Sequence, residues 1–168
     1  TRKRKAATRD PKERYAGAVA DRICEEGWFG RKTGKGYYVY EGKDITPNPA
    51  VDRFIAEERE KAGITPRPLT DQEIVDRYMT AMISEAARVV EDGTARRPLD
   101  VDMVFLFGYG FPRHRGGPLH YADTIGAAAL VARIKDYAKE DATYWQVPAL
   151  LEKMAANGTS FADMNKEA

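Results

Sequence analysis

The sequence predicts an all-α fold, and three features carry that prediction. Apolar residues recur at three- and four-residue spacing along most of the chain, as they do on one face of a helix. Helix-capping residues stand before several of these stretches, at Asp10-Pro11, Asn48-Pro49 and Thr70-Asp71. Few segments alternate with the period of two that marks a half-buried strand. We therefore expect helices joined by turns rich in glycine and proline.

The composition is typical of a globular protein in water, with 43% apolar and 32% charged residues among 168. No apolar run reaches the roughly 20 residues that span a bilayer, and no segment is typical of a signal peptide. The single cysteine, Cys24, can form no internal disulfide, so we interpret it as a small, at least half-buried apolar side chain. The chain opens at Thr1 instead of Met, which is typical of a piece of a longer protein.

The net charge of +1 is distributed unevenly. Five of the 27 basic residues lie in the first nine positions, before Asp10, which leaves 22 basic against 26 acidic residues in the rest. A nucleic-acid-binding surface would be basic, so we interpret the arm as a solvated linker. The alternative is an independent helical interaction module that uses this arm on nucleic acid or on an anionic membrane.

The first predicted helix begins at Asp10-Pro11, carries Tyr15, Val19 and Ile23, and ends at Gly27. Its narrow apolar stripe requires another element to pack against. An aromatic, glycine-rich stretch follows over residues 28–40, and we predict a packed surface turn there.

Phosphate binding is the alternative for this turn. A P-loop needs four residues between its first glycine and its Gly-Lys pair. Here Gly30 and Gly34 enclose three residues, and Gly36 stands where the hydroxyl residue belongs.

A second helix is predicted from Asn48-Pro49 to Gly63, with Val51, Phe54 and Ile55 on its apolar face. Residues 63–68 contain two prolines separated by one residue, which predicts a stiff, extended linker. We place the domain boundary in this linker.

The longest predicted helix starts at a capping box, Thr70-Asp71-Gln72-Glu73, and ends at Asp92-Gly93. Its apolar stripe is broad, which implies contacts on more than one side. The stripe comprises Ile74, Val75, Tyr78, Met79, Met82, Ile83, Ala86, Val89 and Val90.

Asp100 is predicted to cap a short helix over residues 101–107. Asp100 and Asp102 diverge by about 200° on that helix, so they cannot share a proton or a metal ion. Residues 106–118 then hold four glycines and two prolines, together with three aromatic residues and a leucine. We predict a rigid, packed corner between helices rather than a mobile loop.

Three further helical segments are predicted after the corner, over residues 119–125, 127–138 and 148–158. The second of them carries Leu130, Val131, Ile134 and Ala138 on one face. The third carries Leu150, Leu151 and Met154 and closes at Gly158.

Neither histidine predicts a metal site, because His114 and His120 are six residues apart and no third ligand is near them in the sequence. Arg113 and Arg115 could bind a phosphate, although solvation or ion pairing is the commoner use of such residues. The sequence Gly108-Tyr109-Gly110 begins a dinucleotide-binding motif, but Arg113 occupies the place of its third glycine and no strand precedes it.

No serine, threonine or cysteine stands beside an evident base. We therefore predict no catalytic, cofactor-binding or metal-binding residue in this chain. A small enzyme that acts at Arg113, His114 and Arg115 is the alternative.

Two stretches resemble a known family. The run Gly27-Trp28-Phe29-Gly30-Arg31-Lys32-Thr33-Gly34-Lys35-Gly36-Tyr37-Tyr38 is similar to the signature that closes the C-terminal helical domain of 3-hydroxyacyl-CoA dehydrogenases. Residues 74–126 resemble the second copy of that domain in multifunctional enzymes of fatty-acid β-oxidation. The motifs that carry this likeness are Ser84-Glu85-Ala86, Glu91-Asp92-Gly93, Asp100-Val101-Asp102, Gly108-Tyr109-Gly110-Phe111-Pro112 and Gly116-Gly117-Pro118.

The resemblance implies that the catalytic groups lie elsewhere. In the family, an enoyl-CoA hydratase/isomerase module and a Rossmann NAD domain precede two helical repeats. The catalytic His and Glu belong to the Rossmann domain and its exit, and neither motif is in this chain. An Asn-Arg pair at the start of the first repeat corresponds here to Asp76-Arg77, and the added charge implies that this copy does not handle substrate.

The resemblance sets our expectations for the whole chain. Residues 1–46 are the tail of the first repeat, 47–69 a helix and proline-rich linker, and 70–168 the second repeat, an all-α domain of the 3-hydroxyacyl-CoA / 6-phosphogluconate dehydrogenase type. NAD is the cofactor of the parent enzyme, with no cofactor in this chain. The expected partners are the first repeat and the Rossmann domain, with self-association as a further option and acyl-CoA met only through the parent.

We expect no nucleic-acid or membrane partner. The last residues, Asn165-Lys166-Glu167-Ala168, lack a peroxisomal Ser-Lys-Leu ending, which favours a bacterial cytoplasm.

Overall fold

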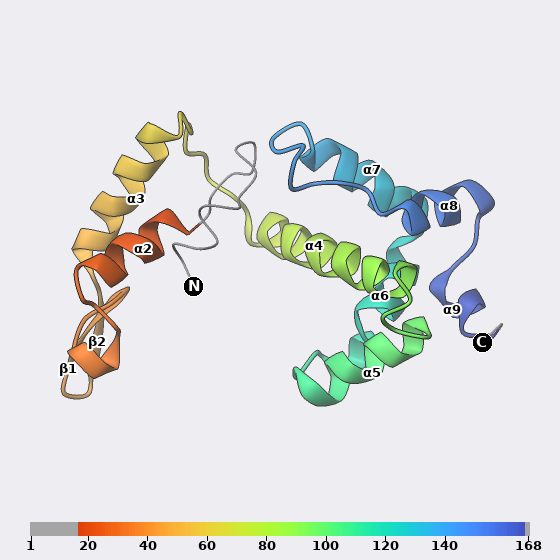
Figure 1. Ribbon diagram of the computed structural model, residues 1–168, viewed down its shortest axis with the longest axis horizontal. Coiled ribbons are helices and arrows are strands. Elements are labelled where there is room, and N and C mark those ends of the chain that lie inside the picture. The colour runs from red at the N-terminus through yellow and green to blue at the C-terminus, as the bar shows by residue number, and fades with distance from the viewer. Residues whose placement is uncertain (1–16, 167–168) are drawn as a thin grey trace. The chain divides into compact units, whose positions relative to one another are not determined.

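The computed structural model describes residues 17–166, which fall into two compact units, residues 17–68 and 69–166 (Figure 1). The basic arm, the predicted helix start at Asp10-Pro11 and Tyr15 lie outside the described residues. Helices dominate both units, which confirms the all-α prediction, and one two-stranded hairpin is added to them. Within residues 17–166, no helix combines the length and the apolar character that crossing a bilayer requires.

The smaller unit is built on two helices, α2 (Ala18–Glu25) and α3 (Pro49–Lys61). Ile23 of α2 packs against Val51 and Phe54 of α3, the apolar faces that the sequence predicts. The ring of Trp28 stacks on that of Phe54 with 5.9 Å between centroids. The Asn48 side chain accepts a hydrogen bond from the Ala50 N–H, which confirms the predicted cap of α3.

A β-hairpin joins these helices where we predicted only a turn. After the 3-10 turn η1 (Arg31–Thr33), β1 (Tyr38–Glu41) pairs antiparallel with β2 (Asp44–Pro47) across Gly42. Both strands are mostly exposed, so they lack the apolar alternation that marks a half-buried strand. Asn48 also holds the hairpin base, because its Nδ2 donates to the Gly36 carbonyl at 2.7 Å.

The larger unit is a layered helical domain (Figure 1). It comprises α4 (Asp71–Glu91), α5 (Pro98–Gly108), the 3-10 turn η2 (Arg113–Arg115), α6 (Pro118–Ile125), α7 (Ala127–Tyr137), α8 (Ala149–Asn157) and α9 (Phe161–Met164). Helix α6 packs against α4 and α5, and α7 lies beside α8. The large apolar side chains buried at the centre include Ile83, Leu119, Leu130, Ile134, Leu151 and Phe161.

Helix α4 begins and ends where predicted. Thr70 Oγ1 accepts the Glu73 N–H at 3.1 Å, and Gly93 follows the helix with φ of 70°. The broad apolar stripe divides in two, however. Met79 and Ile83 belong to the side that faces the core, whereas Val75 and Tyr78 lie on an exposed side.

Helix α5 begins three residues before the predicted start. Pro98 is its first residue and Arg97 its N-cap, so the assignment of Asp100 as the N-cap was wrong. Proline suits the first helical position because it has no N–H to leave unpaired. Asp100 still stabilises the start of the helix. Its carboxylate accepts hydrogen bonds from the backbone N–H of Arg97 at 3.1 Å and from the guanidinium of Arg97 at 2.7 Å.

Candidate functional site

The corner between α5 and α6 is built on a buried carboxylate. Asp102 is only 3% exposed, and its two oxygens accept the N–H groups of Leu119 at 2.8 Å and His120 at 3.0 Å. Both N–H groups belong to the first turn of α6, where the helix itself provides no acceptor for them. Burial raises the pKa of Asp102, while the two N–H groups act in the opposite direction.

Gly117 lets that carboxylate reach the helix start. Its φ is 107°, and a Cβ built on it would overlap the side chain of Asp102. From the sequence, Asp102 was interpreted as unable to share a proton or metal ion with Asp100 and as part of a family motif, with no role in the corner. A signal was present, because Gly117 starts a helix without any side chain to cap it, so another residue must supply the acceptor.

The corner packs less completely than predicted. Phe111 is buried, and its ring meets that of Phe105 edge-on with 6.2 Å between centroids. Phe107 and Tyr109, however, are 70% and 76% exposed. Two of the three aromatic residues that we expected to pack therefore lie on the surface.

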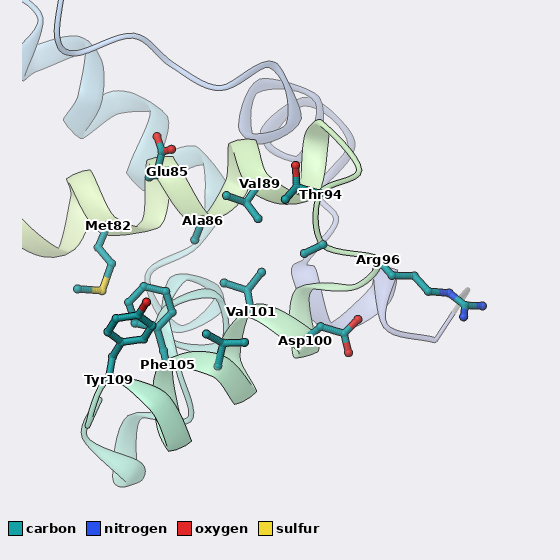
Figure 2. Close-up of a pocket in the computed structure, with 12 residues that line it drawn as sticks. Met82, Glu85, Ala86, Val89, Thr94, Arg96, Asp100, Val101, Phe105 and Tyr109 are labelled. Carbon is teal, nitrogen blue, oxygen red and sulfur yellow. The ribbon is translucent and has the colours of Figure 1, made fainter. Parts of the chain in front are cut away.

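An apolar groove of about 740 Å³ runs between α4 and α5 (Figure 2). Met82, Ala86 and Val89 line it from α4, and Val101, Val104 and Phe105 line it from α5, with Tyr109 at one end. The side chains of Glu85 and Arg96 point away from the groove (Figure 2). Its wall therefore offers packing surface rather than groups for proton transfer.

The apolar surface continues beyond the groove. Helix α5 also exposes Leu99, Met103 and Phe107, and α4 exposes Val75 and Tyr78. We call the groove and these neighbouring side chains the α4–α5 face. Exposed apolar side chains on two neighbouring helices are typical of interaction surfaces.

The two histidines belong to different elements. His114 belongs to η2, whereas the His120 ring lies beside Gly116, so closely that a Cβ there would overlap it. No group of three metal-binding side chains occurs within the described part of the chain. Cys24 is exposed, which corrects the expectation of a buried thiol.

The cations of the glycine-rich turn lie on its own aromatic rings. Lys35 Nζ is 4.1 Å from the centroid of Trp28, and the guanidinium of Arg31 is 5.0 Å from that of Tyr40. Such contacts stabilise a surface turn by about 0.5–1 kcal/mol each.

The larger unit contains the features that decide the family. The C-terminal domain of 3-hydroxyacyl-CoA dehydrogenase matches this chain over residues 74–163, more than half of its length. The chain belongs to the 3-hydroxyacyl-CoA dehydrogenase family. The matched segment begins in α4 and ends in α9, so it includes both the corner and the groove.

Members of the family from distant organisms share this segment. The peroxisomal bifunctional enzyme of Danio rerio is 39% identical in an alignment 160 residues long, which covers 90% of this chain and 22% of the enzyme. The fatty acid oxidation complex subunit alpha of Pseudomonas syringae is 37% identical over 145 residues, 86% of this chain and 20% of the subunit. The chain therefore spans about a fifth of the length of these relatives.

A solved structure shares the fold. The dehydrogenase part of multifunctional enzyme 1 from Caenorhabditis elegans superposes with a TM-score of 0.62 over 90% of this chain and 35% of that one. The two sequences are 21% identical, so this likeness concerns the fold alone.

Asp76 and Arg77, the pair that we interpreted from the sequence as a departure from the family's Asn-Arg, are engaged in ion pairs. Asp76 Oδ1 accepts the Gln72 amide at 2.9 Å and lies 3.7 Å from Arg133 of α7. Arg77 donates to Glu140 at 2.8 Å, and its guanidinium lies 4.3 Å from the centroid of Tyr137. Both charges hold α4 to α7 and its following loop.

Proposed function

We propose that this chain is the C-terminal helical part of a multifunctional enzyme of fatty-acid oxidation, and that it supports the dehydrogenase part without carrying chemistry itself. The α4–α5 face is the observation that supports this role. It combines an apolar groove with exposed apolar side chains on two neighbouring helices. A surface of this composition gains free energy when another protein surface covers it.

The proposed occupant is the first helical repeat of the parent chain, with the Rossmann domain beyond it. Residues 1–46 would be the tail of that first repeat, and residues 70–168 the second repeat that supports it. Where the rest of the parent is missing, a second copy of this chain would cover the same face.

The reaction of the parent would be the transfer of a hydride from a 3-hydroxyacyl-CoA to NAD, which gives the 3-ketoacyl-CoA. Hydration of an enoyl-CoA would take place in a separate module. Both activities require residues that this chain does not supply, and a bacterial cytoplasm is the proposed location.

A binding and activity assay on the isolated chain tests this proposal. We expect no heat of NAD binding in calorimetric titration, and no NADH absorbance with 3-hydroxybutyryl-CoA. The full-length enzyme of a relative, assayed in parallel, is the positive control. Micromolar affinity for NAD, or turnover by the chain alone, would overturn the non-catalytic role.

A further inference from the structure

The segment that connects α7 to α8 consists of turns and extended chain, and it runs alongside α4 (Figure 1). We call this segment, residues 138–148, the strap. Arg77 of α4 donates a hydrogen bond to the carboxylate of Glu140 in the strap at 2.8 Å. Arg88 of α4 donates to the backbone carbonyl of Gln146 at 2.6 Å. The two arginines are eleven residues apart, which is about three helical turns, so both leave the same side of α4.

The strap and α4 enclose a pocket instead of packing fully against each other. Its volume is about 190 Å³, and its lining includes Ser84 and Arg88 of α4 together with Tyr144, Trp145 and Gln146 of the strap. Side chains that border a gap lose the dispersion contacts that a packed interface provides. The closed strap therefore gains less free energy from its contact with α4 than full packing would give.

A buried hydroxyl on the same side of α4 lacks a partner. Thr80 is fully buried, and within residues 17–166 its Oγ1 has no hydrogen-bond partner. It lies about one turn before Ser84, whose own hydroxyl donates to the Thr80 carbonyl at 2.8 Å. An unsatisfied buried hydroxyl lowers the stability of the packing around it.

The strap is held mainly by local contacts and by one large ring. Its backbone N–H groups donate to nearby carbonyls, as that of Trp145 does to Asp141 at 3.0 Å and that of Asp141 does to Tyr137 at 3.3 Å. The Trp145 ring lies 4.9 Å from the ring of Tyr137 and packs against the core. The fully buried apolar side chains at the centre of the unit come from the helices.

We propose that the strap opens away from α4 while the helices of the larger unit stay folded, and that the hydrogen bond from Arg88 to Gln146 holds it closed. Opening would uncover Ser84 and Arg88, which line the enclosed pocket. Among the described residues that line the groove, neither of these two occurs. The opening strap therefore goes beyond the proposed supporting role, which concerns the groove and its surroundings.

Thiol labelling of the full chain tests the proposal. Cys24 is the single cysteine and is exposed, so Cys24→Ser gives a background without reactive thiols. In this background, Ser84→Cys places a thiol beneath the strap at a position that is 5% exposed, and Ala122→Cys places one in α6 at a position that is 1% exposed. With dithionitrobenzoate, Ser84→Cys should react about tenfold faster than Ala122→Cys or more, because local opening is more frequent than global unfolding.

Variants of two arginines test what holds the strap closed. Arg88→Met, which removes the donor, should raise the labelling rate at position 84 about tenfold and leave the rate at position 122 unchanged. Arg96→Met, in the wall of the groove, is the matched control and should change neither rate. The proposal is wrong if both positions react at one rate, if Arg88→Met accelerates both equally or neither, or if position 84 reacts as fast as the exposed Cys24.

The fluorescence of Trp145 provides a second measurement if Ser84→Cys does not fold. The other tryptophan, Trp28, lies in the smaller unit, so Trp28→Phe leaves Trp145 as the single emitter. Arg88→Met should raise the quenching of Trp145 by acrylamide, and Arg96→Met should not. Unchanged quenching in Arg88→Met would also overturn the proposal. The supporting role would stand in that case, since NAD binding and turnover test it separately.

Discussion

Two residues that meet at the corner, Asp102 and Gly117, show how one buried contact connects two helices. The carboxylate supplies the acceptors that the start of α6 lacks, and the glycine leaves the space for it. The sequence predicted a rigid corner, and its glycines have the positive φ that this requires at positions 110, 116 and 117. The sequence indicates that the start of α6 needs an acceptor from another residue, but not that Asp102 supplies it, because Leu119 and His120 lie 17 and 18 positions after Asp102.

Substitutions at two glycines should therefore differ in their effect. Gly110→Val should cost about 1–3 kcal/mol, because φ is 69° but the space around it is open. Gly117→Val should cost more, because it also displaces Asp102 and leaves two N–H groups of α6 unpaired. Thermal melting measures both, with the exposed His114→Ala as the control that should melt like the natural chain. Equal melting temperatures for the two glycine variants would contradict this account.

Asp163 should make stability sensitive to acid. The hydroxyl of Ser160 and the ammonium of Lys166 lower the pKa of Asp163 to about 2 from its ordinary 3.8. Because the folded pKa is the lower one, the stabilisation is complete above 3.8 and is lost as the pH falls towards 2. The free energy of unfolding of Asp163→Asn should thus be lower than that of the natural chain at neutral pH, and the difference should close near pH 2. A difference that does not change with pH would show that the carboxylate contributes nothing through its charge.

At the scale of elements, local capping chemistry was the most reliable predictor. Asn48, Thr70, Gly93 and Gly158 mark helix ends as expected, since each cap is decided within three or four residues. The hairpin was missed because its strands are exposed. Helix α9 was missed because four residues are too few to show an apolar period.

Helix α9 is held by a carboxylate from another helix, as α6 is. Asp123 of α6 accepts the N–H groups of Phe161 and Ala162, each at 2.9 Å. Asp123→Asn should destabilise the chain by about 1 kcal/mol in urea unfolding, and hydrogen exchange at these two amides should become faster. Asp136→Asn is the matched control, since that exposed carboxylate is paired with Lys139, three residues later, and caps no helix start in the described part of the chain. Unchanged exchange in Asp123→Asn would show that α9 is held by the burial of Phe161 alone.

At the scale of the whole molecule, the family could be predicted from two motif blocks, whereas the division of the α4 stripe could not. Val75 and Tyr78 have the same apolar character as Met79 and Ile83, and only packing distinguishes the side that the unit buries from the side that it leaves exposed. A sequence pattern shows which side chains are apolar and favour burial. It does not show whether they are buried by the same unit or by another surface.

The exposed side of α4 should determine how the chain associates. Met82 lies in the wall of the groove, so Met82→Glu would place a charge in any contact that covers it, at a cost of several kcal/mol unless the charge is paired. If copies of the isolated chain cover this face, sedimentation velocity should show an associated species for the natural chain and a monomer for Met82→Glu. Lys153→Glu, on the exposed side of α8, should sediment like the natural chain. If Met82→Glu alters neither association nor stability, the face is open to solvent and the supporting role loses its contact surface.

The close approach of Gly117 to Asp102 also restricts the order in which this lineage can change. A side chain at position 117 would meet the carboxylate, whereas a smaller residue at position 102 would leave the glycine unharmed. Mutation at 102 must therefore come before any side chain can be placed at 117, and even then the φ of 107° at this position would strain the new residue. A descendant with alanine at 117 and aspartate still at 102 should therefore be absent among functional variants.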